Sequence, residues 1–233
     1  MPRPDPDPVV QTTSNLTLRI VSAVVLAPVA LFAAYLGGWP FALFWTAAAI
    51  AVLWEWTTLV TGPVWMIAGV GYAGVMLAAP MILRHDIDLG FLAMVLLFAI
   101  VWTTDILGYF AGKAIGGPKL MPAISPKKTW SGAFAGTLGA MIVAVLVASL
   151  FGSFNGTAIA SIALLLSVMA QLGDLLESWI KRHFGAKDAS QLIPGHGGVM
   201  DRLDGFWAAA FVGCAIGLLR GGFDTPAHGL LVW

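Results

Sequence analysis

Charge is scarce in this sequence. Only 10% of its 233 residues are Asp, Glu, Lys or Arg, whereas 59% are hydrophobic. A soluble domain carries about 25% charged residues, and a surface with so few charges would not remain in water. The composition therefore excludes an ordinary soluble domain and predicts that lipid surrounds the folded chain.

Other features that the sequence lacks narrow the function. Cys214 is the only cysteine, so the chain can form no intrachain disulfide, and we expect this thiol to be a small packing residue. No Cys joins a His at ligand spacing, which argues against zinc. The motifs GxxxxGK[ST] and GxSxG are missing too. The 12 Lys and Arg balance 12 Asp and Glu, so we expect no nucleic-acid partner.

What the sequence does have is a series of long apolar runs. A helix needs about 20 apolar residues to cross a bilayer, so the runs predict an all-α, polytopic transmembrane helical bundle of about seven spans, with a range of roughly six to nine. The predicted spans are 18–36, 39–60, 63–83, 89–112, 131–151, 157–182 and 203–223. Segment 115–126 could hold a further short or re-entrant helix.

Residues outside the spans suggest how the chain is organised and oriented. Residues 1–15 are polar and rich in proline, which predicts a disordered tail before a single transmembrane domain at 16–233. With a cytoplasmic N-terminus, only Arg84 and Arg220 among the Lys and Arg residues would lie outside. This distribution follows the positive-inside rule, so we expect the N-terminus in the cytoplasm.

Glycines mark one side of the span 131–151. Gly132, Gly136 and Gly139 are spaced so that small residues follow one another along this side. Small residues let helix backbones approach closely in a membrane. The pattern predicts close packing against another helix, either within the chain or in a dimer.

Polar residues gather in the stretches 105–131 and 171–205. In the second stretch, Asp174, Glu177, Ser178 and Lys181 share one helical face because they are spaced i, i+3, i+4 and i+7. At about 1.5 Å per residue, Asp174 would lie about 25 Å along a helix that starts near residue 157. A carboxylate at that depth costs about 3 kcal/mol and needs a partner, either Lys181 or a cation.

A loop rich in glycine follows this helix. Its Pro-Gly-His-Gly-Gly run, 194–198, predicts an irregular backbone whose N–H groups could bind an anion. Asp201 and Asp204 come next, three residues apart, at the start of the last long span. They would share one side of that helix, where its dipole favours carboxylates.

The first stretch supplies cations and another acid. Lys119 and the run 125–129 (Ser-Pro-Lys-Lys-Thr) suit polyphosphate oxygens, although a loop that faces lipid headgroups has the same composition. Asp105 lies within a span, with Tyr109 one turn away, and an acid in a span is a functional candidate by default. Acids for a hard cation, lysines for phosphates and a glycine-rich loop together predict metal-dependent phosphoryl transfer with Mg²⁺.

These stretches resemble a known family. Ser178 to Arg182, Lys187-Asp188, the 194–198 run and Asp201 to Asp204 look like the signature of the phosphatidate cytidylyltransferases, or CDP-diacylglycerol synthases, and the spacing agrees throughout. Gln171 to Asp174, Asp105 with Tyr109, and the run 125–129 are similar to other stretches of the family. The resemblance covers about 105–207, the expected catalytic part.

The resemblance implies a reaction and a set of site residues. CTP and phosphatidate would give CDP-diacylglycerol and pyrophosphate, with Mg²⁺ as cofactor, alone or with a second cation. Asp174 and Asp201 would be the metal ligands. The other residues assigned to catalysis or substrate binding are Ser125, Lys127, Lys128, Thr129, Lys181, Arg182, Lys187, Asp188, His196, Gly197, Gly198, Arg202, Asp204, Asp105 and Tyr109.

Roles for some of these residues stay open. Lys127, Lys128, Lys181 and Lys187 are candidate phosphate clamps. Arg182 and Arg202 would hold the lipid phosphate or pair with Asp188 and Asp204. His196 would orient the loop or a phosphate, or act in proton transfer. Glu177 would belong to the site or simply pair with Lys181.

The sequence departs from the family's usual pattern at two positions. Ser131 stands where the family usually has Glu, and Gly108 where it usually has Ala. The resemblance implies a homodimer in a bacterial inner membrane with the active site facing the cytoplasm. Alternatives are another lipid-phosphate transferase or kinase, or a transporter, although the ionisable groups gather towards one face rather than at the midplane.

Overall fold

Helices make up most of the part of the chain that the computed structural model describes, residues 24–193 and 197–233. A short apolar helix, Val24–Leu36, comes first. The following elements are α2 (Gly38–Leu59), α3 (Pro63–His85), α4 (Gly90–Ile115), β1 (Lys119–Met121), β2 (Ser125–Thr129), α5 (Trp130–Phe151), α6 (Gly156–His183), α7 (Met200–Gly221) and α8 (Pro226–Leu231).

The predicted fold class is confirmed. Within the described residues, six helices, α2 to α7, are long and apolar enough to cross a membrane, and each matches a predicted span to within a few residues. The chain is therefore an all-α, polytopic integral membrane protein. The predicted span 18–36 is described only from residue 24, and the predicted tail at 1–15 lies outside the described residues.

Segment 115–126 was predicted wrongly as a possible helix. It contains β1 and the start of β2, which pair antiparallel, with Lys119 opposite Thr129 and Met121 opposite Ser125. Gly116 and Gly117, both with positive φ, turn the chain after α4. Pro118, Pro122 and Pro126 then interrupt any helical hydrogen bonding.

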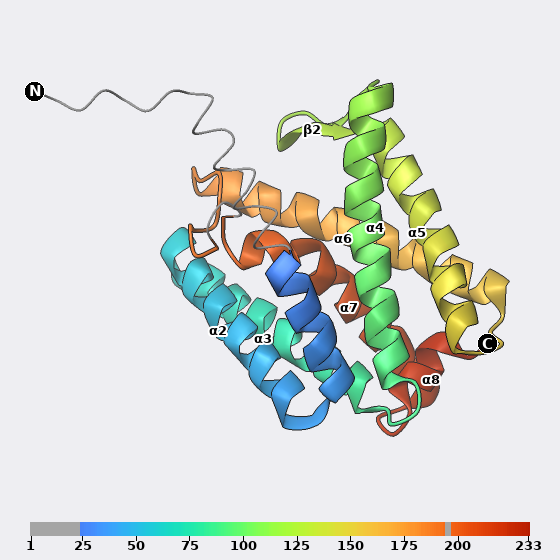
Figure 1. Cartoon of the computed structure of the whole chain (residues 1–233). Coiled ribbons are helices and arrows are strands. Elements are labelled where there is room, and N and C mark those ends of the chain that lie inside the picture. Colours follow the sequence, from blue (N-terminus) through green and yellow to red (C-terminus); the bar gives the residue numbers. More distant parts are fainter. Residues whose placement is uncertain (1–23, 194–196) are drawn as a thin grey trace, which may run out of the picture.

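The closest helix pair is α4 and α5, which run side by side in Figure 1. A Cβ atom on Gly132 or Gly136 would lie 2.5 Å from the carbonyl oxygen of Gly108 or Thr104, so only glycine allows this approach. Gly139 faces the side chain of Leu107 in α4. The predicted close packing is confirmed within the chain. The glycine face itself is covered by α4. A homodimer, with the span 131–151 as a possible contact, stays a prediction.

The bundle has two different ends. The β hairpin lies at the C-terminal end of α4, and α8 lies near the other end (Figure 1). At the α8 end, the buried carboxylate of Asp86 accepts hydrogen bonds from the backbone N–H groups of Leu89 (3.0 Å) and His228 (3.0 Å). Burial alone would raise the pKa of Asp86, but these bonds and the adjacent His228 ring hold that pKa below its usual value.

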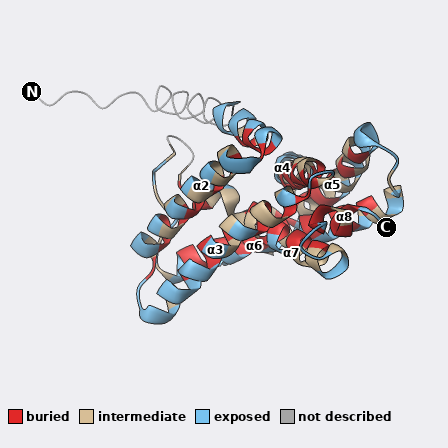
Figure 2. Cartoon of the chain, turned by 90° about the horizontal axis from the view of Figure 1, so that it is seen from below, coloured by how far each residue is buried: buried red, intermediate tan, exposed pale blue. Residues whose placement is uncertain are grey.

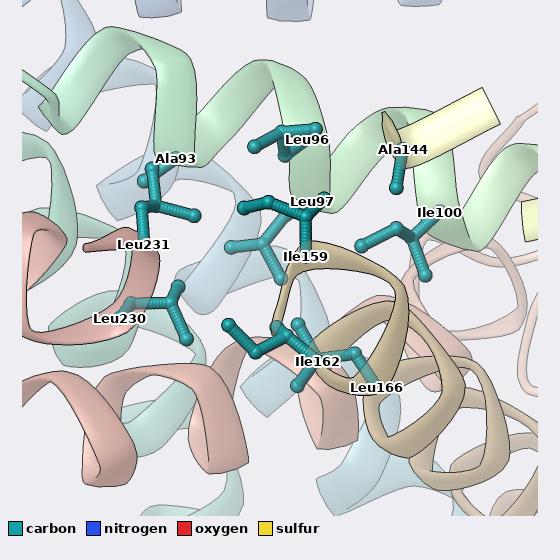
Figure 3. A pocket seen from close by; sticks show the side chains of 10 residues that line it. All are labelled: Ala93, Leu96, Leu97, Ile100, Ala144, Ile159, Ile162, Leu166, Leu230 and Leu231. Atoms are coloured by element: carbon teal, nitrogen blue, oxygen red, sulfur yellow. The ribbon is translucent and has the colours of Figure 1, made fainter. Parts of the chain in front are cut away.

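Buried residues concentrate where α4, α6, α7 and α8 meet, and the outer faces of α2 and α3 are exposed (Figure 2). A void of about 10 Å³ lies in this core, and Figure 3 shows that all ten side chains around it are apolar. A void with no polar lining stays dry. This void is a packing defect and is not the functional site.

Candidate active site

A cavity of about 790 Å³ lies at the hairpin end of the bundle. Its walls come from α4, the hairpin, the start of α5, the C-terminal half of α6 and the start of α7. This volume is within the range of about 300–1,000 Å³ that is typical of small-molecule sites. The predicted site residues that line it are Asp105, Tyr109, Lys127, Lys128, Thr129, Asp174, Lys181, Asp188, Asp201, Arg202 and Asp204.

Three acids meet on one wall of this cavity. Asp174, Glu177 and Asp204 each offer a carboxylate oxygen, and these oxygens lie within 4.8 Å of one another. Glu177 is buried, and its Oε1 has no hydrogen-bond partner among the described residues. Close carboxylates repel one another unless a cation lies between them. An all-oxygen donor set with an unpartnered buried oxygen fits a hard divalent cation such as Mg²⁺.

Two glycines allow α6 and α7 to bring these acids together. A Cβ atom on Gly173 would lie 2.5 Å from the carbonyl oxygen of Asp204. One on Gly205 would lie 3.1 Å from the carbonyl oxygen of Ala170. The helix backbones therefore touch next to the cluster, and this approach places Asp204 beside the acids of α6.

Lys181 is held between two carboxylates. Its Nζ lies 2.9 Å from Oε2 of Glu177 and 2.5 Å from Oδ1 of Asp201. Oδ2 of Asp201 also accepts hydrogen bonds from the backbone N–H groups of Ala189 (3.0 Å) and Gly198 (2.7 Å). Asp201 thus connects Lys181 to the α6–α7 loop (residues 184–199) and is not one of the three clustered acids. Its role as a metal ligand stays a prediction.

Three backbone N–H groups where this loop enters α7 have protein acceptors. Gly198 donates to Asp201, while Val199 and Met200 donate to the buried carboxylate of Glu55 at 2.8 and 2.7 Å. These three amides are therefore not free for a ligand anion. That amides of the 194–198 run bind an anion stays a prediction, because residues 194–196 lie outside the described residues. The positive end of α7 attracts an anion as expected, but protein side chains supply it. His196 lies outside the described residues.

The hairpin brings Lys128 to the acids. Its ammonium forms an ion pair with Asp174 across the cavity. Thr129 begins α5, since its hydroxyl accepts a hydrogen bond from the Gly132 N–H at 3.2 Å. Ser131, in the place of the family's Glu, donates to the carbonyl of Gly116 at 2.5 Å and so ties the end of α4 to the start of α5.

Five described residues of the predicted site do not line the cavity: Ser125, Arg182, Lys187, Gly197 and Gly198. Arg182 donates to the carbonyl of Ala186 at 3.0 Å and so supports the turn after α6. Lys187 is exposed. Gly197 adopts φ of 83°, a backbone conformation that favours glycine. Their predicted roles in catalysis or substrate binding stay predictions.

Sequence reasoning missed two features near the cavity. Glu55 of α2 was overlooked, although an acid within an apolar span is itself a signal. A buried polar chain also joins three helices, because the Ser167 hydroxyl lies 2.7 Å from that of Thr104 and 3.1 Å from that of Thr137. The Gln171 amide donates to Thr137 at 2.9 Å. Single hydroxyl residues spread over separate spans give no local pattern that would identify this chain.

The sequence of this chain is similar to the sequences of known proteins. The model of the cytidylyltransferase family matches residues 61–218. A phosphatidate cytidylyltransferase of Brucella suis is 40% identical, and the match covers 92% of this chain and 97% of the relative. One from Rickettsia bellii is 39% identical over 82% of this chain and 86% of the relative. One from Haemophilus influenzae is 41% identical over 54% of this chain and 45% of the relative.

Proposed function

Because the chain belongs to the phosphatidate cytidylyltransferase family, we propose that it transfers the cytidylyl group of CTP to phosphatidate, giving CDP-diacylglycerol and pyrophosphate. The observation that carries this proposal is the cavity at the hairpin end, where three clustered carboxylates lie beside Lys128 and Lys181. Such a site can hold two anionic phosphates together, which is the main task in phosphoryl transfer.

The reaction places modest demands on acid–base chemistry. A phosphate oxygen of phosphatidate attacks the α-phosphorus of CTP and forms a new P–O bond. The bond from the α-phosphorus to the oxygen that bridges to the β-phosphate breaks, and pyrophosphate leaves with the electron pair. The attacking oxygen is already anionic, so no side chain has to remove a proton from it. The protein has to position both substrates and offset their negative charge.

Asp174, Glu177 and Asp204 would hold Mg²⁺, by the donor set and the unpartnered Oε1 of Glu177. A bound Mg²⁺ polarises a phosphoryl oxygen and offsets the charge of the transferring group. The resemblance adds Asp201 as a ligand and leaves room for a second cation. Asp201 would take that role beside its contact with Lys181.

Basic residues around the cavity would bind the phosphates. Lys127 and Arg202 line the cavity and are exposed, so both are accessible to a soluble nucleotide. Lys128 pairs with Asp174, and Lys181 is fixed by Glu177 and Asp201. We assign Lys127 and Lys128 to the polyphosphate of CTP and Arg202 to the phosphate of the lipid.

The cavity end would face the cytoplasm. Lys113, Lys119, Lys127 and Lys128 all line the cavity, whereas Arg220 contacts the carbonyl of Gly229 in α8 at the other end. The positive-inside rule assigns the lysine-rich end to the cytoplasm. CTP would then enter from water, and phosphatidate would enter sideways from the adjacent leaflet of the bacterial inner membrane.

A direct test uses the purified protein in detergent micelles with CTP, phosphatidate and Mg²⁺. We expect CDP-diacylglycerol and pyrophosphate in equal amounts, and loss of both with EDTA. Asp174→Asn should abolish product, whereas Asp88→Asn, in an exposed loop at the other end, should leave the rate unchanged. Conversion of phosphatidate with ATP instead of CTP would point to a lipid kinase. No conversion with either nucleotide by folded protein would refute the proposal.

A further inference from the structure

A second group of carboxylate contacts lies just outside the cavity and starts from α2. Glu55 is fully buried, at 0% exposure, in α2, which lies before the residues 61–218 that the family model matches. Its Oε1 accepts hydrogen bonds from the Ser190 hydroxyl at 2.6 Å and the Val199 N–H at 2.8 Å. Its Oε2 accepts one from the Met200 N–H at 2.7 Å. A buried carboxylate with this many donors is fixed in place.

These contacts join both sides of the α6–α7 loop. Ser190 lies in its first half, and Val199 and Met200 lie where it enters α7. The loop fits closely against the carboxylate, because a Cβ atom on Gly198 would lie 2.7 to 2.8 Å from the carboxylate atoms of Glu55. Glycine at this position is therefore explained by contact with Glu55.

The same loop holds the charged network of the cavity. Ala189 and Gly198, next to the residues that Glu55 binds, donate their N–H groups to Asp201. Asp201 in turn contacts Lys181 at 2.5 Å. Glu55 is thus linked to Asp201 and Lys181 by two sets of hydrogen bonds to adjacent residues of the same loop, although Glu55 does not line the cavity.

We infer that Glu55 is a positioning residue for the reaction, one that acts through Asp201 to hold Lys181 at the cavity. This inference rests on the proposed cytidylyltransferase function. A glutamine at position 55 would keep the shape of the side chain but would offer an NH₂ donor where the carboxylate accepts. At least one of the three donors would then lose its acceptor, and the loop would no longer be fixed.

The test is a double-mutant cycle measured in the CTP and phosphatidate assay. Glu55→Gln should lower kcat/KM at least tenfold, and Asp201→Asn should lower it further. If Glu55 acts through Asp201, the double variant should be no slower than Asp201→Asn alone. Thr57→Val is the matched control and should leave the rate unchanged, since among the described residues this exposed hydroxyl of α2 bonds only to the carbonyl of Trp54.

Two results would overturn the inference. One is a Glu55→Gln variant with the wild-type rate. The other is a double variant whose losses multiply, because a residue needed only for stability would act independently of Asp201. If Glu55→Gln does not fold, Ser190→Ala removes one of the three hydrogen bonds and should still lower kcat/KM at least twofold, and an unchanged rate would overturn the inference. Wild-type protein that makes no product would instead refute the proposed function.

Discussion

Gly173→Ala tests whether the contact between α6 and α7 builds the acidic cluster. The added Cβ would lie 2.5 Å from the carbonyl oxygen of Asp204 and 2.7 Å from the Cβ of Ala208. Carbon atoms in contact normally stay about 3.5–4.0 Å apart, so the helices would have to separate locally by about 1 Å. That movement would carry Asp204 away from Asp174 and Glu177.

Gly173→Ala should lower the catalytic rate more than it lowers the stability of the fold. Forcing one extra methyl group into a packed core lowers the free energy of unfolding by about 1–3 kcal/mol. A displacement of about 1 Å at a reacting site can lower the rate by about 100-fold. We therefore expect Gly173→Ala to remain folded with a lower Tm, to bind Mg²⁺ more weakly and to lose about 100-fold in kcat/KM.

The assays are the rate of CDP-diacylglycerol formation over a range of Mg²⁺ concentrations and the thermal unfolding of the same sample. Gly213→Ala is the matched control, because Gly213 is likewise buried, in the neighbouring helix α7, and its added Cβ would meet only side-chain atoms at 3.6 Å or more. This control should keep the wild-type rate. A folded Gly173→Ala protein with wild-type rate and wild-type Mg²⁺ dependence would show that the α6–α7 contact does not set the geometry of the acidic cluster.

Three other changes have defined outcomes. Lys128→Met should lower kcat/KM at least tenfold by removing a cation beside Asp174, as initial rates at varied CTP would measure. Thr129→Ala should lower the free energy of unfolding by about 1 kcal/mol through loss of the α5 cap, measured by denaturant unfolding. Asp86→Asn should lower Tm at pH 7, and the difference should narrow below about pH 4, because a carboxylate with a lowered pKa loses its stabilising contribution as pH falls through that pKa. Thermal unfolding across pH, with Asp88→Asn as control, checks this.

The spans could be predicted because their signal is local. A run of about 20 apolar residues is sufficient to indicate a helix that crosses the membrane, and α2 to α7 agree with the predicted runs. The hairpin was harder to predict than the spans. Its short segments between prolines are equally compatible with a broken helix and with a turn. The pairing of β1 with β2 decides between them, and this pairing joins residues that are separated in the sequence.

The same distinction applies to the site. Helical spacing placed Asp174 and Glu177 on one face, and the α6 helix carries both to the cavity. Asp204, and not Asp201, lies beside these two acids because of where α7 crosses α6. No local sequence pattern predicts that crossing. Glu55 contacts residues more than 130 positions away, so only the folded chain relates it to the α6–α7 loop.

In the proposed reaction, the α-phosphoryl group of CTP moves with its nucleoside to phosphatidate. The most direct measurement compares CTP labelled with ³²P at the α-phosphate with CTP labelled at the γ-phosphate, each incubated with purified protein, phosphatidate and Mg²⁺. We predict that α-label enters the lipid and γ-label appears in pyrophosphate. Label from the γ-phosphate in the lipid would indicate a kinase, and no label in the lipid from either substrate would contradict the account.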